Sequence, residues 1–288
     1  MLTFVECFNR KQFNQLKALL NACKKQDGNT IPVYEAVLAR RRHPACNMLY
    51  YHHQKLVGFL GIYFFYESAC ELSLMIAPDA RGQGISRKLL NKSLPFLRQN
   101  HIQEIVFSTP YGLINPTLTS ETPQFQHTEF AMFRNDKTPV TQKDKSLIVR
   151  TAKVCDIPLL CDIHKRCFAG STDKREEHFM ALLKRPERTL FIAELDGHAV
   201  GKAHIYWEAK GARFSDIAIL PPMQHKGYGR ALLSYCINHA LIKGKFDLSL
   251  DVEAQNQNAL TLYQALGFKV VNAYAFWKVS LHALQNGA

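Results

Sequence analysis

Residues 224–233, QHKGYGRALL, place two glycines one residue apart between an apolar run that ends in proline and a run with helical spacing. Residues 81–90, RGQGISRKLL, repeat this layout. A strand, a short glycine loop and a helix N-terminus together form an anion cradle, because free backbone N–H groups and the positive end of the helix dipole face the same point. Glycine also allows a ligand to approach the backbone closely. Both stretches therefore predict a site for a phosphate group or a similar anion.

Side chains in and beside each loop can add donors to these backbone groups. In the second loop the candidate residues are Gln224, His225, Lys226, Gly227, Gly229 and Arg230. In the first loop they are Arg81, Gly82, Gln83, Gly84 and Ser86. The dinucleotide fingerprint G-x-G-x-x-G is absent from both, because Leu232 and Arg87 occupy the third glycine position. Neither loop contains the P-loop pattern G-x-x-x-x-G-K-[ST].

The two loops occupy the same place in the two halves of the chain. Gln224 follows Arg81 by 143 residues, close to half of the 288 residues. Such an offset indicates tandem copies of one domain. Residues 136–146 are polar and charged and include a proline, as is typical of a linker. We therefore predict an N-terminal domain at 1–135, this linker, and a C-terminal domain at 147–288.

The elements that must position the second loop can be predicted from hydrophobic periodicity. The C-terminal half shows the order β-α-α-β-β-β-α-β-α-β, a mixed α/β domain with helices on both faces of one sheet. The predicted elements are a strand at 146–152, helices at 156–168 and 171–185, a hairpin at 189–209, a strand at 212–220, a helix at 230–242, a strand at 246–253, a helix at 258–268 and a strand at 269–281.

The N-terminal half repeats this order up to its glycine loop, with its second helix predicted at 33–42. Beyond residue 110 it diverges. Pro116 and Pro123 lie in a stretch rich in Ser and Thr, so the last helix is predicted to be broken or missing.

Composition excludes several classes of protein. An apolar content of 47% is typical of a globular core, and no apolar run reaches the ~18 residues of a membrane span. The N-terminus lacks a signal-peptide pattern, so we expect a cytoplasmic protein without a membrane partner. Eight scattered cysteines suit free thiols. Cys161, His164 and Cys167 have a spacing that could gather zinc ligands, but no fourth ligand can be placed, and we expect no metal.

The formal net charge is +12, and both halves are basic. A basic protein attracts nucleic acid, acidic lipid or a polyanionic small molecule. The clearest basic cluster, Arg40–Arg42, is interpreted as a solvated helix end without an aromatic platform, so we expect no nucleic-acid partner.

The second loop resembles that of the GCN5-related N-acetyltransferases (GNAT), whose signature [Q/R]-x-x-G-x-[G/A] holds the pyrophosphate of acetyl-CoA. Residues 224–229 match it, with Tyr228 at the variable position. A second motif of the family, N-x-x-A-x-x-L-Y-x-x-x-G-F, matches residues 256–268. The first loop, with Ile85 at the variable position, matches less well because Ser86 stands where Gly or Ala is expected, and its second motif is not recognisable. The layout resembles that of tandem members of the family.

The resemblance implies two tandem GNAT-like domains, each a mixed sheet flanked by helices. The C-terminal domain would transfer acetyl from acetyl-CoA, as co-substrate, to a primary amine by direct attack. The backbone of Ile217, Ala218 and Ile219 would pair with the pantetheine arm, and an N–H there would polarise the thioester carbonyl. Asn256 would hydrogen-bond the cofactor or brace the final strand. Tyr263 would protonate the departing thiolate as general acid.

The attacking amine must first lose a proton, and the candidate bases are Asp216, Asp251 and Glu253. The last two lie two residues apart on one face of a strand. Tyr263 could instead pack on Phe268. Two aromatic residues outside both motifs, Tyr206 and Trp207, could line an acceptor pocket or cover the sheet.

Other functions remain open at this point. The N-terminal domain is interpreted as a diverged copy, structural or cofactor-binding without catalysis. The main alternative for the chain is a non-catalytic acyl-CoA-binding or regulatory module, in which Tyr263→Phe changes nothing. A nucleic-acid-binding protein would instead show affinity that falls steeply with salt. The acceptor, a small-molecule or peptide amine, and the choice between monomer and homodimer are undecided.

Overall fold

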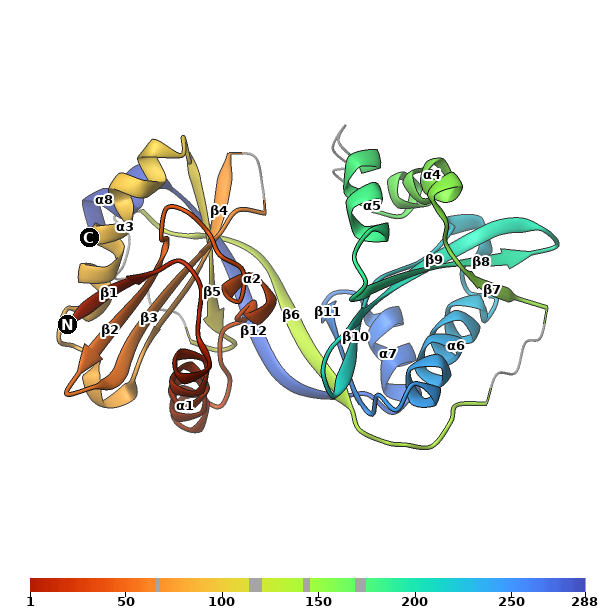
Figure 1. Cartoon of the computed structure of the whole chain (residues 1–288), viewed down its shortest axis with the longest axis horizontal. Helices are drawn as coiled ribbons and strands as arrows, with labels where there is room; N and C mark the ends of the chain where they lie inside the picture. The colour runs from red at the N-terminus through yellow and green to blue at the C-terminus, as the bar shows by residue number, and fades with distance from the viewer. Residues whose placement is uncertain (66–67, 114–120, 142–145, 169–174, 288) are drawn as a thin grey trace. The chain divides into compact units, whose positions relative to one another are not determined.

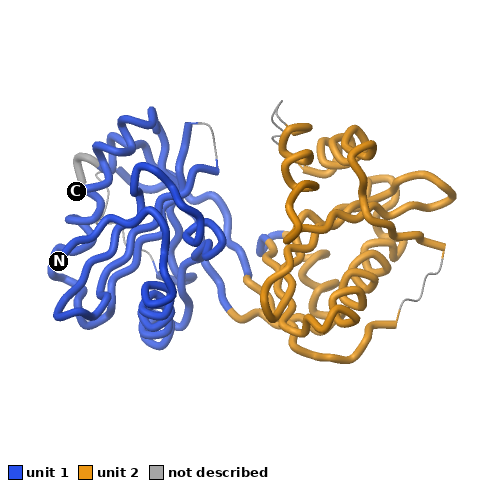
Figure 2. The backbone as a smooth tube through the Cα atoms, in the orientation of Figure 1, with its two compact units in different colours: residues 1–130, 253–255, 272–288 blue, residues 131–252, 256–271 orange. Residues whose placement is uncertain are grey.

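The computed structural model describes residues 1–65, 68–113, 121–141, 146–168 and 175–287. The chain forms two compact units (Figure 2). Unit 1 consists of residues 1–130, 253–255 and 272–288, and unit 2 consists of residues 131–252 and 256–271.

Unit 1 is built around a mixed sheet (Figure 1). Its elements in chain order are β1 (Leu2–Val5), α1 (Arg10–Asp27), α2 (Glu35–Leu38), β2 (Asn47–His52), β3 (Lys55–Tyr63), β4 (Ala69–Ile76), the 3-10 turn η1 (Pro78–Ala80), α3 (Ile85–Gln99), β5 (Glu104–Pro110), most of β12 (Lys269–Ser280) and α8 (Leu281–Gly287). The strand order is β1-β2-β3-β4-β5-β12. Only β4 and β5 run parallel; the other neighbours are antiparallel.

Helices cover both faces of this sheet. A Cβ atom on Gly58 of β3 would lie 3.0 Å from the Ile85 side chain of α3. The next residue, Phe59, points to the other face and contacts Phe8, which precedes α1. On that face α1 buries Leu16 and its neighbours at helical spacing.

The second helix of unit 1 is shorter than predicted. It ends at Leu38, whereas the sequence predicts a helix over 33–42. Arg42 turns inward and donates to the carbonyl of Ile62, and Arg41 pairs with Glu6. Pro44 also disfavours a helical backbone at the residue before it. The interpretation of Arg40–Arg42 as a solvated helix end is therefore wrong for Arg42, whereas Arg40 and Arg41 are exposed just after the helix.

Unit 2 confirms the element order predicted for the C-terminal half. Its elements are β7 (Ile148–Thr151), η3 (Val154–Asp156), α4 (Ile157–Cys167), α5 (Arg175–Leu183), β8 (Arg188–Leu195), β9 (His198–Trp207), β10 (Gly211–Ile219), η4 (Pro221–Met223), α6 (Tyr228–Ile242), β11 (Asp247–Glu253) and α7 (Gln257–Ala265), followed by β12. The strand order is β11-β10-β9-β8-β7, with β10 and β11 parallel. The predicted start of the second helix at 171–174 lies outside the described residues.

The two faces of the unit 2 sheet carry different helices. Leu190 and Ile192 of β8 pack in one cluster with residues of α4 and α5. Phe191 lies between them in sequence and packs on Tyr235 and His239 of α6. The predicted α/β architecture with helices on both faces is confirmed.

Two strands pass from one unit to the other. β6 (Gln124–Arg134) begins in unit 1 and ends in unit 2, and β12 belongs to unit 1 from Asn272 onward. Residues 274–280 of β12 pair with β5. The side chain of Asn272 also accepts from the backbone of Thr30 at 2.8 Å and donates to its carbonyl at 2.9 Å. Residues 272–280 therefore complete the sheet of unit 1.

Between β5 and β6 the described residues form no helix, and Pro116 and the other residues of 114–120 lie outside them. The two units are defined by contacts between residues, whereas the predicted domains at 1–135 and 147–288 are two copies of one sequence pattern. The limits of these domains therefore stay a prediction. No helix in the described ranges combines the length and the apolar character of a membrane span.

Candidate functional site

The two glycine loops follow the same backbone course. Gly227 precedes α6 with φ 89°, and Gly84 precedes α3 with φ 73°. Two residues earlier, His225 and Gly82 are also left-handed, with φ 62° and 75°. A Cβ atom on Gly227 or Gly84 would meet nothing within 4 Å. Backbone conformation therefore favours glycine there, and the space beside it is open to a ligand.

The first turns of α3 and α6 have no side-chain cap. Their free N–H groups and the positive end of the helix dipole favour an anion. In α6 the Nε atom of Arg230 is also buried and has no hydrogen-bond partner within the described part of the chain. The residues present thus fit the pyrophosphate of a CoA ester.

Gln224 and Arg81, predicted as ligand donors, brace the loops. Gln224 donates to the carbonyl of Ile219 at 2.9 Å, and Arg81 donates to the equivalent carbonyl of Ile76 at 3.3 Å. Arg81 also makes hydrogen bonds of 2.8 and 2.6 Å to Asp27. These side chains fix the course of each loop, and a contact with an anion stays a prediction.

The remaining predicted loop residues differ in exposure. His225 and Lys226 are exposed, whereas Tyr228 and Ser86 are half-buried. The side-chain amide of Gln83 donates to the carbonyl of Asp79 at 3.4 Å, and Ile85 is buried against Gly58. A Cβ atom on Gly229 would lie 3.6 Å from Leu262 of α7, an ordinary contact, so the protein itself tolerates a side chain at this position.

The strands before each loop separate from their parallel neighbours. In unit 2, β10 pairs with β11 only from Gly211 to Arg213. In unit 1, β4 pairs with β5 only from Ala69 to Leu72. Beyond these points the described residues of β10 and β4 have no strand partner on that edge, which leaves room for an extended ligand between the carbonyls that Gln224 and Arg81 hold and the paired ends of the strands.

Only β10 carries a bulge beside this separation. Its register with β9 shifts between Ser215 and Ala218, so Asp216 and Ile217 fall between paired positions. Asp216 has φ 56°, an uncommon value for a residue with a side chain. Ala218 and Ile219 pair with β9 beyond the bulge. β4 pairs with β3 without interruption from Glu71 to Ile76. Bulges re-aim backbone groups, so this feature distinguishes the two units at the predicted thioester position.

The carboxylate of Asp216 is held by a buried cluster on the α4–α5 face. Its oxygens lie 2.8 Å from Lys202 Nζ, 3.2 Å from His204 Nδ1 and 3.7 Å from His164 Nδ1. Lys202 is 0% exposed and lies over the rings of Phe168 and Phe179. This cluster anchors the bulge through its side chain.

The cluster holds one cation and one anion at neutral pH. Burial lowers the pKa of His204 to about 3 and that of His164 to about 4, with the charge of Lys202 adding to both effects. Burial alone would raise the pKa of Asp216, but His204 and Lys202 lower it by more. Burial lowers the pKa of Lys202 as well, and the charge of Asp216 opposes this effect. Both histidines are therefore neutral beside the Lys202–Asp216 ion pair. The Sγ atom of Cys167 faces the carbonyl of Ile219 at 3.5 Å.

The other predicted polar residues lie around the end of β11. Asp251 forms an ion pair with Arg213 of β10. Glu253, the last residue of β11, is exposed. Asn256 is the N-cap of α7, and its side chain accepts from the backbone of Ala259 at 3.1 Å. A direct contact of Asn256 with a cofactor stays a prediction.

Tyr263 is buried in α7 with 8% of its surface exposed. Its ring contacts Phe268 edge-on at 6.3 Å, as the packing alternative expected. Burial raises the pKa of Tyr263 to about 12, and its hydroxyl makes no hydrogen bond in the described portion of the structure. The group is therefore protonated at neutral pH and available as a donor.

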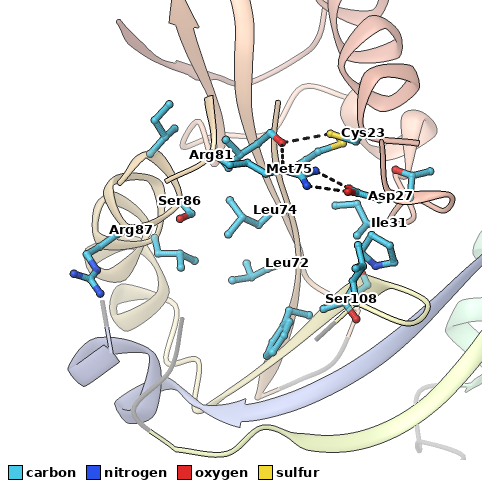
Figure 3. Close-up of a pocket in the computed structure, with 18 of the residues that line it drawn as sticks. Cys23, Asp27, Ile31, Leu72, Leu74, Met75, Arg81, Ser86, Arg87 and Ser108 are labelled. Carbon is cyan, nitrogen blue, oxygen red and sulfur yellow. Dashed lines mark hydrogen bonds and ion pairs between the residues drawn. The ribbon is translucent and has the colours of Figure 1, made fainter. Parts of the chain in front are cut away.

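Unit 1 contains a cavity of about 590 Å³ beside its own glycine loop (Figure 3). Cys23 and Asp27 of α1, Leu72 and Leu74 of β4, Ser86 and Arg87 of α3 and Ser108 of β5 are among the residues that line it. The Ser108 hydroxyl is buried and has no hydrogen-bond partner among the described residues. The cavity thus extends from the loop into the gap between β4 and β5.

Unit 1 also holds a buried carboxyl group that the motifs did not identify. Glu71 of β4 is 2% exposed and accepts a hydrogen bond of 2.8 Å from the Tyr34 hydroxyl. Burial outweighs the effect of Tyr34 and, with the charge of Glu129, raises the pKa of Glu71 to about 7.

Lys202 and His204 of unit 2 were also missed by the sequence analysis. Their spacing in the apolar stretch VGKAHIYW, which puts both side chains on one face, was the available signal.

Each of the two units combines a separated pair of parallel strands with an uncapped glycine loop. A family model described as "Acetyltransferase (GNAT) family" matches residues 13–111 and 157–268. The chain therefore belongs to the GNAT family, with one match in each half, and acyl transfer is the reaction class of this family.

Curated relatives match parts of the chain. An N-alpha-acetyltransferase of Sulfurisphaera tokodaii is 28% identical over 143 residues, 45% of this chain and 84% of that protein. The [ribosomal protein bS18]-alanine N-acetyltransferase of Escherichia coli is 42% identical over 57 residues, 20% of this chain and 38% of that protein. An uncharacterized N-acetyltransferase of Methanocaldococcus jannaschii is matched over 47% of its length, at 28% identity over 35% of this chain.

Solved structures match the whole chain. A GCN5-related N-acetyltransferase from Sphaerobacter thermophilus superposes with a TM-score of 0.78 at 16% identity, covering 98% of this chain and 95% of the other. A tandem GNAT protein from the clavulanic acid biosynthesis pathway gives a TM-score of 0.68 at 12% identity, with 98% of both chains covered. These similarities confirm the predicted tandem GNAT fold.

Proposed function

We propose that unit 2 transfers acetyl from acetyl-CoA to a primary amine. The observation that carries this proposal is that β10 is bulged beside its separation from β11, with an uncapped helix start and Tyr263 in the same unit. When bound, acetyl-CoA supplies an acetyl group activated as a thioester.

Each part of unit 2 has a role in this proposal. The N–H groups at the start of α6, with Lys226 and Arg230, hold the pyrophosphate. The bulged backbone at Ile217 donates to the thioester carbonyl, and Asp216 with Lys202 keeps that backbone in place. The amine nitrogen forms a bond to the acetyl carbon as the carbon–sulfur bond breaks, and Tyr263 gives its proton to the sulfur.

Among the predicted bases, Asp216, Asp251 and Glu253, we favour Asp251 for the proton of the amine. Asp216 is already bound by Lys202 at 2.8 Å, and Glu253 is grouped with unit 1. Asp251 is in unit 2, and its partner Arg213 is 42% exposed at the side chain, whereas the partner of Asp216, Lys202, is 0% exposed. The names of the relatives describe alanine and other amine acceptors, which supports an amine as the acceptor class.

The eight free cysteines support a reducing compartment such as the cytoplasm.

For unit 1 we propose acyl-CoA binding without transfer. Its cavity lies beside a loop of the same conformation, whereas β4 lacks the bulge. The two copies of one fold would then have different roles, a catalytic copy and a binding copy.

Calorimetric titration with acetyl-CoA tests both sites. Ser86→Glu and Gly229→Glu place a carboxylate at equivalent positions in the first turns of α3 and α6, where it suits the helix dipole and repels a phosphate. Ser86→Gln and Gly229→Gln are the matched neutral controls. We expect two sites in the wild-type chain, each lost with its own glutamate variant. One site lost only with Gly229→Glu contradicts the proposal for unit 1, and the absence of binding contradicts both.

Thiol release in the presence of a primary amine tests transfer. Tyr263→Phe should lower kcat by about 10²-fold or more, the usual contribution of a general acid, with acetyl-CoA binding unchanged. An unchanged kcat would favour the non-catalytic alternative for Tyr263.

A further inference from the structure

A row of polar side chains crosses the sheet of unit 2 near the start of β10. Arg188 of β8 lies opposite Tyr206 of β9, which lies opposite Arg213 of β10, and Arg213 lies opposite Ser249 of β11. Leu190, two residues after Arg188, packs against α4 and α5, so the row lies on that face. Arg188 and Tyr206 are half-buried and the Arg213 side chain is 42% exposed, so a ligand can reach the row.

Among the residues that the structure describes, Arg188 has no counter-ion. Its guanidinium lies 4.4 Å from the centre of the Tyr206 ring, and its Nε atom is buried without a hydrogen-bond partner in the described ranges. No carboxylate among the described residues lies within ion-pair distance of it. Burial lowers the pKa of Arg188, as expected for a charge held away from water. A buried donor left unpaired costs about 1–3 kcal/mol, so this arrangement favours a ligand that accepts from it.

The surrounding charges leave an excess of positive charge on this face. Lys202 is neutralised by Asp216, and Arg213 by Asp251. Arg175 at the start of α5 also has a buried Nε atom without a partner in the part of the chain that the structure describes. The ligand that fits an unpaired guanidinium group such as that of Arg188 is an oxyanion.

This position is distinct from the proposed pyrophosphate site. Arg213 precedes Ile219 by six residues of strand, about 20 Å, and the glycine loop lies beyond Ile219. The bulge at Asp216 lies between the two. Asp251, the favoured base, is bound to Arg213 and so lies beside the row. An anion at Arg188 is therefore on the acceptor side of the proposed reaction.

We propose that Arg188, stacked on Tyr206, binds a carboxylate or another oxyanion carried by the amine acceptor. The substrate class of unit 2 is then an amine that bears an oxyanion, such as an amino acid. This inference rests on the proposed acetyl transfer by unit 2.

The test compares amines that differ only in the oxyanion. Acetyl transfer is measured for L-phenylalanine against 2-phenylethylamine, and for O-phosphoethanolamine against ethanolamine, so that carboxylate and phosphate are separated. The prediction concerns the pair of amines that the wild type discriminates. Arg188→Met should lower kcat/KM of the amine that bears the oxyanion by about ten- to a hundredfold. It should lower kcat/KM of the amine without the oxyanion by less than about threefold. Arg188→Lys should restore part of the preference. Lys184→Gln, the same loss of charge at an exposed position, should leave the ratio unchanged.

Stability separates this role from a structural one. An unpaired half-buried cation does not support the fold, so Arg188→Met should keep or raise the Tm. A lowered Tm with equal loss for both members of a pair overturns the proposal. Equal transfer by the wild type to both members of both pairs also overturns it and leaves the proposed function standing.

Binding is measured independently of transfer. A Tm increase of the wild type with L-phenylalanine or O-phosphoethanolamine, absent in Arg188→Met and without acetyl-CoA present, supports the anion site even if no amine is acetylated. In that case only the proposed function of unit 2 fails. The absence of a Tm increase together with the absence of discrimination overturns the inference.

Discussion

Glu71 and Lys202 show two ways in which this chain holds ionisable groups inside its sheets. Lys202 has an ionised partner, Asp216, at 2.8 Å. Glu71 has a neutral donor, the Tyr34 hydroxyl, and its nearest charges include another acid, Glu129. A buried charge is stable only when it is paired, so Lys202 stays charged whereas Glu71 retains its proton up to about pH 7.

We predict that Glu71 makes the stability of unit 1 depend on pH. Its pKa is raised from about 4.5 to about 7 in the folded chain, so the unfolded chain binds fewer protons between these values. The contribution of Glu71 to stability is complete below about pH 4.5 and is lost as the pH rises through about 7. The loss amounts to ~3 kcal/mol, since one pKa unit corresponds to about 1.4 kcal/mol.

Urea unfolding at a series of pH values measures this effect. Glu71→Gln keeps the acceptor for Tyr34 and cannot ionise, so its free energy of unfolding should exceed that of the wild type increasingly from pH 4.5 to 7. A constant difference between the two proteins over this range would show that Glu71 does not titrate as predicted.

At the scale of elements, local patterns predict much of the fold and part of the site. Alternating apolar residues and the Asp196-Gly197 turn predict the β8–β9 hairpin, and the glycine loop predicts the start of α6. The bulge at Asp216 could not be predicted, because it is defined by the register with β9 rather than by the residues of β10 alone. The partners of Lys202 could not be predicted for the same reason, since they come from α4 and β10.

The two glycines of the second loop should respond differently to substitution. Gly227→Ala forces a side chain into a left-handed backbone at φ 89° and should cost ~1 kcal/mol or more of stability. Gly229 lies in the first turn of α6, where a Cβ atom has only ordinary contacts, so Gly229→Ala should be neutral or stabilising. Thermal unfolding of the two variants gives the comparison. Equal destabilisation by both would contradict the backbone argument.

At the scale of the whole molecule, the order of residues along the chain does not match their grouping into the two units. Local sequence patterns predict the strand at 269–281 but not its neighbour, because strand pairing depends on residues far away in the sequence. In the structure, residues 274–280 pair with β5, so the unit that begins the chain also contains its last strand.

Removing residues 272–288 should therefore affect unit 1. The truncated chain leaves β5 without its antiparallel partner, and the backbone amides of residues 104–109 that face β12 should lose hydrogen-exchange protection. The amides of β8 and β9 in unit 2 serve as the internal control and should stay protected. A chain ending at Ser280 separates the loss of β12 from the loss of α8. Full protection of β5 in the shorter chain would contradict the assignment of β12 to unit 1.

The place of β12 also sets the order of events during synthesis. A ribosome makes residues 272–280 after every residue of unit 2 has been made. The sheet of unit 1 therefore stays incomplete, with the outer edge of β5 uncovered, until residues 272–280 have been synthesised. The first half of the gene thus encodes a unit whose sheet can be completed only after unit 2 has been synthesised, and a stalled or prematurely terminated chain would expose that edge to aggregation.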